Sequence, residues 1–237
     1  MGCSGGRRHR KGYRHRPFKG VSDYGGGAYL GDVDEALDWV IDNADAYNIV
    51  AVNLSLGYGN TQVPTYTGLS NKFVQLDAAG IVAVAAAGNA GWTYPDGVSV
   101  IAADPSVVAV SAVDENGTFA SFSQRSPALT DIAAPGVDVN VSTIYGPPAY
   151  SVSGSSFAAP YVAASVALLQ EAANTIIRES LTDEQIVQIL QSSGDDVAGF
   201  SDPSAPEGYA VADANAALEY FIANYQDYQE TTDMFLA

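Results

Sequence analysis

Ser156 is a candidate nucleophile and lies in the first of three segments of the chain that could take part in chemistry. It lies in the run Gly154–Pro160, directly before an apolar stretch that predicts a helix. A helix N-terminus carries a partial positive charge and unpaired N–H groups, which favour an alkoxide or a tetrahedral oxyanion beside it. An N-cap serine is far more common than a nucleophile. The residue types alone therefore leave both interpretations open.

The other two candidate segments follow apolar strands. Asn89 comes after the run Ile81–Ala87 and Gly88, and its side-chain amide could donate a hydrogen bond, although a turn Asn is the common alternative. Gly57 follows the run Ile49–Leu56 and would let the backbone approach a ligand closely. Active sites in parallel sheets gather at the carboxyl ends of the strands, so both segments are candidate parts of a site.

Alternating strands and helices must position these residues. β-branched and apolar runs predict strands over 49–56, 81–87 and 107–113, the first of them buried on both faces. Helical spacing and end signals predict helices that begin at an Asp32 N-cap, with Glu35 three residues on, and at Leu69, Ser156, Asp183 and Ala212. The first helix should bury one face, formed by Val33, Leu37, Val40, Ala44 and Tyr47. The expected fold is therefore α/β, with three layers and a mostly parallel central sheet that has helices on both faces.

Four further expectations concern the ends of these elements. Gly80 should end the helix that begins at Leu69, and Pro160 lies near the first turn of the next, where a missing N–H costs least. A capping box at Thr182 should open the helix that runs to Gln191. The last helix should end near Tyr225.

Charge divides the 237 residues into unequal parts. Residues 1–20 carry seven of the ten basic residues and no acid, which leaves three basic and 27 acidic residues, a net charge of −24, for the other 217. Such an acidic body does not suit nucleic acid or an anionic membrane. The single cysteine, Cys3, excludes an intrachain disulfide framework, and no apolar run of about 18 residues predicts a membrane span.

Three regions follow from this division. Residues 1–20 fit a nucleic-acid-binding arm, a disordered tail or a stretch that is not native to the fold, and the sharp break at Val21 favours the last two. Residues 21–225 form one domain, and residues 226–237 form a polar C-terminal tail. No apolar run follows the basic residues, so the chain shows no signal peptide.

Taken in chain order, several segments resemble the subtilisin-like serine peptidases from about Gly31 to Leu218. Asn53–Gly57 is similar to the family's N-[ML]-S-L-G strand, Gly80–Asn89 to its G-x-x-V-V-x-A-A-G-N segment, and Gly154–Pro160 to the nucleophile signature G-T-S-M-A-x-P. Segments similar to its Y-P, P-x-V-I-x-V-x-A-V, A-S-F-S and A-P-G motifs lie between them: Tyr94–Pro95, Pro105–Val113, Ala120–Ser123 and Ala133–Gly136.

The resemblance implies a role for each matching residue. Ser156 takes the position of the nucleophile, and Asn89 that of the oxyanion-hole donor. The remaining matches take substrate-binding positions. The strand that pairs with the peptide is formed by Ser55, Leu56 and Gly57, and Gly154 precedes the nucleophile. A primary specificity pocket with room for a large apolar side chain is lined by Ala85, Ala86, Ala87 and Gly88.

Two catalytic motifs of the family are absent from the sequence. The family's order is Asp, His, Ser, with the first two in D-[ST]-G and H-G-T-H motifs. Asp23 lies in Ser-Asp-Tyr, and His9 and His15 both lie in Arg-His-Arg, so none is assigned a role. A serine without a base is a poor nucleophile. We therefore expect the chain by itself to be nearly inactive and the N-terminal strands of the fold to be missing.

Three hypotheses follow. The chain is the C-terminal part of a subtilisin-like endopeptidase, with the missing N-terminal half as its partner and peptides or proteins as its substrates. Alternatively, it is a non-catalytic relative that binds peptide along Ser55–Gly57, or an unrelated α/β binding module. The family resemblance also implies secretion. It requires no cofactor, although structural calcium is common in the family; no ligand spacing for it occurs here.

Overall fold

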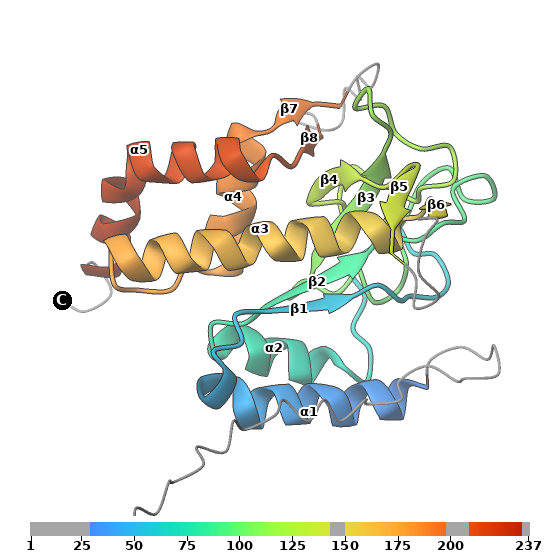
Figure 1. Cartoon of the computed structure of the whole chain (residues 1–237). Helices are drawn as coiled ribbons and strands as arrows, with labels where there is room; N and C mark the ends of the chain where they lie inside the picture. Colours follow the sequence, from blue (N-terminus) through green and yellow to red (C-terminus); the bar gives the residue numbers. More distant parts are fainter. Residues whose placement is uncertain (1–28, 143–149, 198–208, 234–237) are drawn as a thin grey trace, which may run out of the picture.

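A six-stranded sheet separates two groups of helices (Figure 1). The computed structural model describes residues 29–142, 150–197 and 209–233. In the main sheet the strand order is β1-β2-β3-β4-β8-β7, and only the β7–β8 pair is antiparallel. The helices are α1 (Leu30–Tyr47), α2 (Ser70–Ala78), α3 (Ser155–Ile176), α4 (Asp183–Ser193) and α5 (Ala214–Asp233). The strands are β1 (Ala51–Leu54), β2 (Val82–Ala86), β3 (Val108–Val113), β4 (Ile132–Pro135), β5 (Val139–Val141), β6 (Tyr150–Val152), β7 (Asp195–Asp196) and β8 (Ala210–Val211).

The two faces of the sheet bury separate cores. Every residue of β2 and β3 is buried, as expected for strands that are covered on both faces. Alternate residues of β2 face opposite ways, because side chains in a strand alternate. Val84 and Ala86 pack with α3, α4 and α5, whereas Ala83 and Ala85 pack with α1 and α2. The predicted three-layer α/β fold with a mostly parallel sheet is confirmed.

Strand β1 differs from the prediction. It was expected to be buried on both faces, but Ala51 and Val52 are half-buried and Asn53 is exposed. Among the described strands only β2 pairs with β1, so β1 forms an edge of the sheet. A strand with one neighbour lacks the cover that a second neighbour and its connections would supply.

Helix α1 begins two residues before the predicted N-cap. Its N-cap position is Tyr29, which makes no side-chain capping bond, so Asp32 lies inside the first turn rather than at the cap. Val33, Leu37 and Ala44 are buried as predicted, but Tyr47 is 56% exposed, with its ring 5.5 Å from that of Trp39. The predicted apolar face therefore ends one turn before the helix does.

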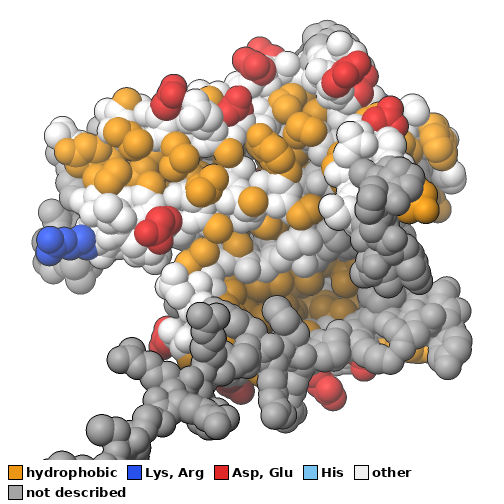
Figure 2. Space-filling view, in the orientation of Figure 1, with side chains coloured by type: hydrophobic (Ala, Val, Ile, Leu, Met, Phe, Trp, Pro, Cys, Tyr) orange, Lys and Arg blue, Asp and Glu red, His pale blue; other side chains and the backbone are white. Residues whose placement is uncertain are grey.

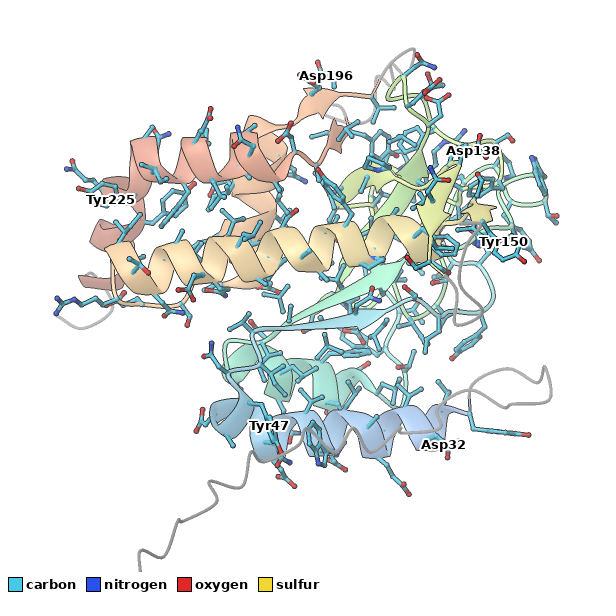
Figure 3. The ribbon with its side chains drawn as sticks, in the orientation of Figure 1. Asp32, Tyr47, Asp138, Tyr150, Asp196 and Tyr225 are labelled. Carbon is cyan, nitrogen blue, oxygen red and sulfur yellow. The ribbon has the colours of Figure 1, made fainter. Side chains whose placement is uncertain are left out.

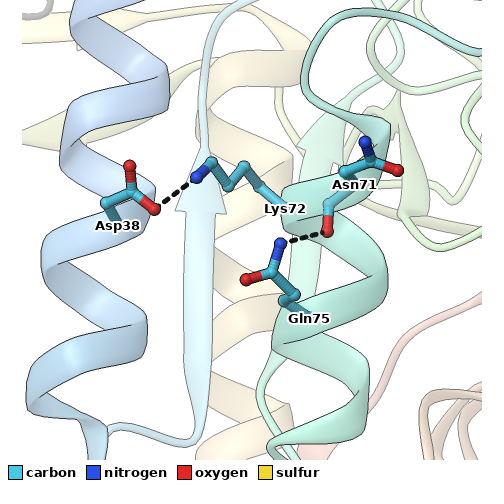
Figure 4. A network of polar contacts seen from close by, with 4 residues as sticks. All are labelled: Asp38, Asn71, Lys72 and Gln75. Carbon is cyan, nitrogen blue, oxygen red and sulfur yellow. Dashed lines mark hydrogen bonds and ion pairs between the residues drawn. The ribbon is translucent and has the colours of Figure 1, made fainter.

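Helix α2 is tied to its neighbour by one ion pair. Lys72 contacts the carboxylate of Asp38 on α1, and Gln75 donates to the carbonyl oxygen of Asn71 within α2 at 2.9 Å (Figure 4). Gly80, which was expected to end this helix, has φ +71°, in the region that favours glycine.

The last two helices bear out one prediction and extend another. Thr182 forms the predicted capping box with Gln185 at the start of α4. Helix α5 runs from Ala214 to Asp233, past the predicted end near Tyr225. The reason is packing: Tyr228 is buried, and its ring lies 5.9 Å from that of Phe221.

Hydrophobic side chains also gather over α3 and α5 on the face shown in Figure 2, where red acidic groups outnumber blue basic ones.

Candidate functional site

The predicted site residues meet at one end of the sheet. The segments that follow β1 and β2 and the first residues of α3 surround a cavity of about 480 Å³. Its lining comprises Ser55, Leu56, Gly57, Tyr58, Gly59, Ala86, Gly88, Asn89, Ala90, Tyr94, Ser99, Gln124, Ser155 and Ser156. The cavity is within the usual size range of small-molecule and side-chain pockets. Parallel pairing of β1 with β2 brings their carboxyl ends to the same edge of the sheet.

The chain between β4 and α3 folds back to place α3 at this edge. Strands β5 and β6 pair antiparallel after β4, and Figure 3 shows Asp138 and Tyr150 together at this end of the molecule. The Gly154 N–H then donates to the carbonyl oxygen of Gly136 at 2.8 Å. Because this bond joins the residue before α3 to the residue after β4, α3 begins beside the end of β4.

Ser156 lies in the first turn of α3 and is half-buried. Its Oγ donates to the carbonyl oxygen of Ser55 at 3.3 Å, and Oγ of Ser55 donates to the carbonyl oxygen of Ser156 at 2.6 Å. Pro160 is the sixth residue of α3, so it lies past the first turn near which it was expected. Proline has no N–H, so it cannot donate to the carbonyl oxygen of Ser156 four residues earlier, as another residue would in a helix. Ser55 supplies the donor that proline cannot.

Hydrogen bonds from Ser155 to its side-chain oxygen orient Asn89. Asn89 Oδ1 accepts from the Ser155 N–H at 2.9 Å and from Ser155 Oγ at 3.0 Å. Since a backbone N–H can only donate, the oxygen must face Ser155, and Nδ2 therefore points the other way. Nδ2 faces the space beside Gly154, where an added Cβ would lie 3.2 Å from it. A side chain at position 154 would crowd the amide.

Of the four residues expected to line a specificity pocket, the structure places two at the cavity. Ala86 and Gly88 line it, whereas Ala85 and Ala87 are fully buried in the core under α1 and α2 and do not. The period of two along a strand explains the difference, because successive side chains point to opposite faces. Gly154 also lies outside the lining and contributes through its closeness to Asn89.

Several lining residues were not predicted from the sequence. Ser99 forms part of the wall, where its Oγ donates to the carbonyl oxygen of Ala86 at 3.0 Å. Tyr58 and Tyr94 line the cavity and keep 48% and 42% of their surface exposed. Gln124 follows directly after the segment Ala120–Ser123, but a lone buried glutamine gives no periodic signal in a sequence. No residue of the lining carries a formal charge.

The described residues contain no histidine, since His9 and His15 both lie outside them. Asp23, Cys3 and all of residues 1–20 also lie outside the described part. Within that part, no group of three or more His, Cys, Asp and Glu residues could hold a metal ion, so we assign no calcium ligand. None of the described helices is long and apolar enough to cross a membrane.

The half-buried carboxyl group of Asp131 lies away from the cavity. Asp131 stands directly before β4, at the amino end of a strand, whereas the cavity borders the carboxyl ends of β1 and β2. Burial raises the pKa of Asp131 to about 6, opposed by the hydrogen bond that its carboxylate accepts from the Ala109 N–H at 2.7 Å. Its position excludes a direct part in chemistry at Ser156.

Comparison with known proteins gives consistent matches. Residues 18–210 match the model of the Subtilase family. The chain is 40% identical over 152 residues to the thermostable alkaline protease of Halalkalibacterium halodurans, which covers 63% of this chain and 38% of that protein. It is 35% identical over 195 residues to the halolysin-like extracellular serine protease Nep of Natrialba magadii, which covers 82% of this chain and 32% of that protein. The chain thus spans less than half the length of these curated relatives.

Solved structures agree with the sequence matches. The self-cleaved protease domain of PatA superposes with a TM-score of 0.66 and 26% identity, covering 86% of this chain and 72% of that one. The prenylagaramide maturation protease PagA gives a TM-score of 0.69 over 85% of this chain and 70% of that one, and at 23% identity this likeness concerns the fold.

Proposed function

The chain belongs to the subtilase family of serine peptidases, and from this membership we propose that it takes part in peptide-bond hydrolysis through an acyl-enzyme on Ser156. The orientation of Asn89 carries the proposal. Its oxygen is held by Ser155, so its amide nitrogen faces the space beside Gly154, two residues before Ser156. Acceptance of the Ser155 N–H is a structural role at the start of α3, and it leaves Nδ2 directed away from Ser155, as a donor to an oxyanion requires.

The proposed reaction begins with attack of Ser156 Oγ on the scissile carbonyl carbon. The Oγ proton passes to a base, and the carbonyl oxygen becomes an oxyanion. Asn89 Nδ2 and the Ser156 backbone N–H donate to that oxyanion at the N-terminus of α3, where the helix dipole adds to the stabilisation. Collapse expels the amine with a proton returned from the base, and water then hydrolyses the acyl-enzyme by the same steps.

The base is the part of this mechanism that the described residues do not supply. Ser156 Oγ donates instead to the Ser55 carbonyl oxygen, which cannot accept a proton in catalysis. We propose that the base and the residue that orients it come from outside the described part, with a polypeptide equivalent to the N-terminal half of the family's domain as the source. Without it the chain should have little activity.

Substrate binding is proposed along the exposed edge of β1 and in the cavity. Ser55–Gly57 continues β1 at the edge of the sheet, with Ser55 and Gly57 exposed and Leu56 half-buried, and is the segment proposed to pair with an extended peptide. The cavity carries no charged residue and has two tyrosines at its wall. It therefore suits a neutral side chain, and the acidic body disfavours acidic substrates. Secretion and structural calcium remain proposals that rest on the family.

Labelling with a fluorescent fluorophosphonate, compared between the chain and Ser156→Ala, tests this function. These probes react with a serine activated as a nucleophile. Labelling that disappears in Ser156→Ala would support the peptidase function and show that a base is present. No labelling of the folded chain, also after addition of the N-terminal half of a related subtilase domain, would contradict it.

A non-catalytic function is the second candidate, because the Ser156 hydroxyl is bonded to a carbonyl oxygen rather than to a base. It predicts peptide binding without labelling. Isothermal titration with an extended neutral peptide distinguishes the two functions: binding that Ser156→Ala leaves unchanged, together with no labelling, would favour the binding module.

A further inference from the structure

We propose that Gln124 is the positioning residue of the oxyanion hole: its side-chain amide joins the turn that carries Asn89 to the loop that follows β1. This inference rests on the proposed role of Asn89. It assigns no contact with substrate to Gln124. The residue acts through the turn Gly88–Ala90, whose position decides where the Asn89 amide points.

The two ends of the Gln124 amide bond to different walls. Oε1 accepts from the Ala90 N–H at 3.3 Å, on the turn that carries Asn89. Nε2 donates to the carbonyl oxygen of Gly59 at 3.2 Å and to Oδ1 of Asn60 at 2.7 Å, on the loop that follows β1. Gln124 is 2% exposed, so water cannot easily replace these bonds. The side chain therefore ties the two segments together at the wall of the cavity.

The main chain of Gln124 is itself held in place. Its N–H donates to the carbonyl oxygen of Gly88 at 2.9 Å, and its carbonyl oxygen accepts from Ser111 Oγ on β3 at 2.9 Å. The neighbouring Ser123 accepts from the Ala112 N–H at 2.8 Å. Since β3 lies in the buried centre of the sheet, these bonds hold the main chain of Gln124 in place.

The Gln124 side-chain amide packs closely against Gly88. A Cβ added at Gly88 would lie 2.0 Å from Oε1 of Gln124, and Gly88 has φ +111°. The glycine thus lets the amide pass directly beneath the turn. Loss of the amide would leave the Ala90 N–H, the Gly59 carbonyl oxygen and Asn60 Oδ1 without this partner, and the turn would be free to move relative to Ser156.

This arrangement makes two separate predictions for kinetics. A displaced Asn89 amide weakens stabilisation of the oxyanion, which lowers kcat or the rate of labelling. A displaced Gly59–Asn60 wall changes the shape of the pocket, which alters KM. A residue that merely stabilised the fold would affect neither once the protein is folded.

The first experiment uses NMR of the ligand-free chain and does not depend on activity. Gln124→Met removes all three side-chain bonds at nearly equal length, whereas Gln124→Glu keeps an acceptor for Ala90 but loses both donors. Gln170→Met is the matched control, because Gln170 is also fully buried and bonds twice to the backbone of Leu181.

In Gln124→Met we expect hydrogen exchange at the Ala90 amide to become at least tenfold faster, and the Asn89 side-chain amide resonances to shift. Gln124→Glu should keep Ala90 protected while the Asn60 resonances shift, and Gln170→Met should move none of these signals. Unchanged Ala90 exchange and Asn89 resonances in Gln124→Met would overturn the proposal. If that variant does not fold, unchanged Asn60 resonances in Gln124→Glu would overturn it.

The second experiment measures fluorophosphonate labelling of the same variants after addition of the N-terminal half of a related subtilase domain, because the chain without a base should have little activity. We expect at least a tenfold slower rate in Gln124→Met, a smaller loss in Gln124→Glu, and the wild-type rate in Gln170→Met under conditions where all are folded. If the wild-type chain is not labelled even then, the proposed function fails, and NMR still decides the role of Gln124. Wild-type labelling in Gln124→Met would overturn the proposal.

Discussion

Ser55 and Ser156 hold each other through two hydrogen bonds, although 101 residues separate them in the sequence. Each hydroxyl donates to the other residue's carbonyl oxygen, at 2.6 Å from Ser55 Oγ and at 3.3 Å from Ser156 Oγ. The shorter bond serves the carbonyl oxygen that Pro160 leaves without its usual helical donor. The end of β1 and the start of α3 are therefore joined at the residue proposed as nucleophile.

The contribution of this contact can be measured with a double-mutant cycle. Ser55→Ala should lower the free energy of unfolding by about 1 kcal/mol when residue 160 is proline, because the Ser156 carbonyl oxygen loses its donor. In a Pro160→Ala background the new N–H can take that oxygen, so the same substitution should cost about half as much or less. Urea denaturation gives both values, and equal costs in the two backgrounds would contradict the explanation.

Asn89→Asp separates the two functions of the Asn89 side chain. A carboxylate still accepts from Ser155 but cannot donate to an oxyanion, so labelling in the presence of the N-terminal half of a related subtilase domain should slow about 100-fold or more while thermal stability changes little. Asn89→Leu removes both functions and should lose labelling and stability together. Labelling rates and melting curves of both variants check this, and wild-type labelling in Asn89→Asp would exclude Asn89 from the oxyanion hole.

Gly88→Ala should destabilise the chain by about 2 kcal/mol or more. The new methyl group would meet the Gln124 amide, and the positive φ of 111° disfavours any residue but glycine. Gly31→Ala is the control, since no atom lies within 4 Å of its added Cβ and it lies in α1, where alanine is the better helix former. Denaturation curves showing similar effects for both variants would refute this account of Gly88.

Asp131 should make stability fall as the pH rises through the range between its two pKa values. Its pKa is raised to about 6 in the folded chain from 3.8, so the folded state holds the proton more tightly and is favoured at low pH. The loss between pH 4 and pH 7 should be about 3 kcal/mol at most. Asp131→Asn should remove it, and urea denaturation of both proteins at pH 4.5 and 7.5 gives the difference. A stability difference between them that does not change with pH would contradict the prediction.

Acidic residues at the two ends of α1 should respond oppositely to charge reversal. The last turn of α1 carries no basic residue, so Asp45→Lys should raise stability by about 0.5–1 kcal/mol at low salt. Asp32 lies in the favourable first turn, so Asp32→Lys should gain less or lose stability although it changes the net charge equally. Both effects should shrink in 1 M NaCl, which screens them. Denaturation at two salt concentrations tests this, and equal effects would point to net charge alone.

Local patterns predicted most of the elements because their causes are local. The runs over 81–87 and 107–113 are apolar enough to mark buried parallel strands, and the Thr182 capping box needs only residues three apart. Burial depends on neighbours, however, and here prediction failed at specific positions. Val52 and Asn53 looked like interior strand residues, yet β1 lies at the edge of the described sheet.

The candidate site was predictable in its motif residues and not in their supports. Ser156 and Asn89 stand in segments that resemble the subtilase family, so the sequence identified both. Gln124, Ser99 and the exclusion of Ala85 from the cavity depend on which side chains face each other across the sheet. No one-dimensional pattern contains that information.

The sequence by itself determined the α/β class, the family and the positions of the proposed nucleophile and oxyanion donor, since these depend on periodicity and short motifs. Tertiary structure alone decided that the Ser55 hydroxyl replaces the N–H missing at Pro160 and that the Gln124 amide joins the Asn89 turn to the loop after β1. Each of these contacts joins segments more than 30 residues apart. Hydrogen bonds need atoms at close distance and in the right direction, and only the folded chain provides both.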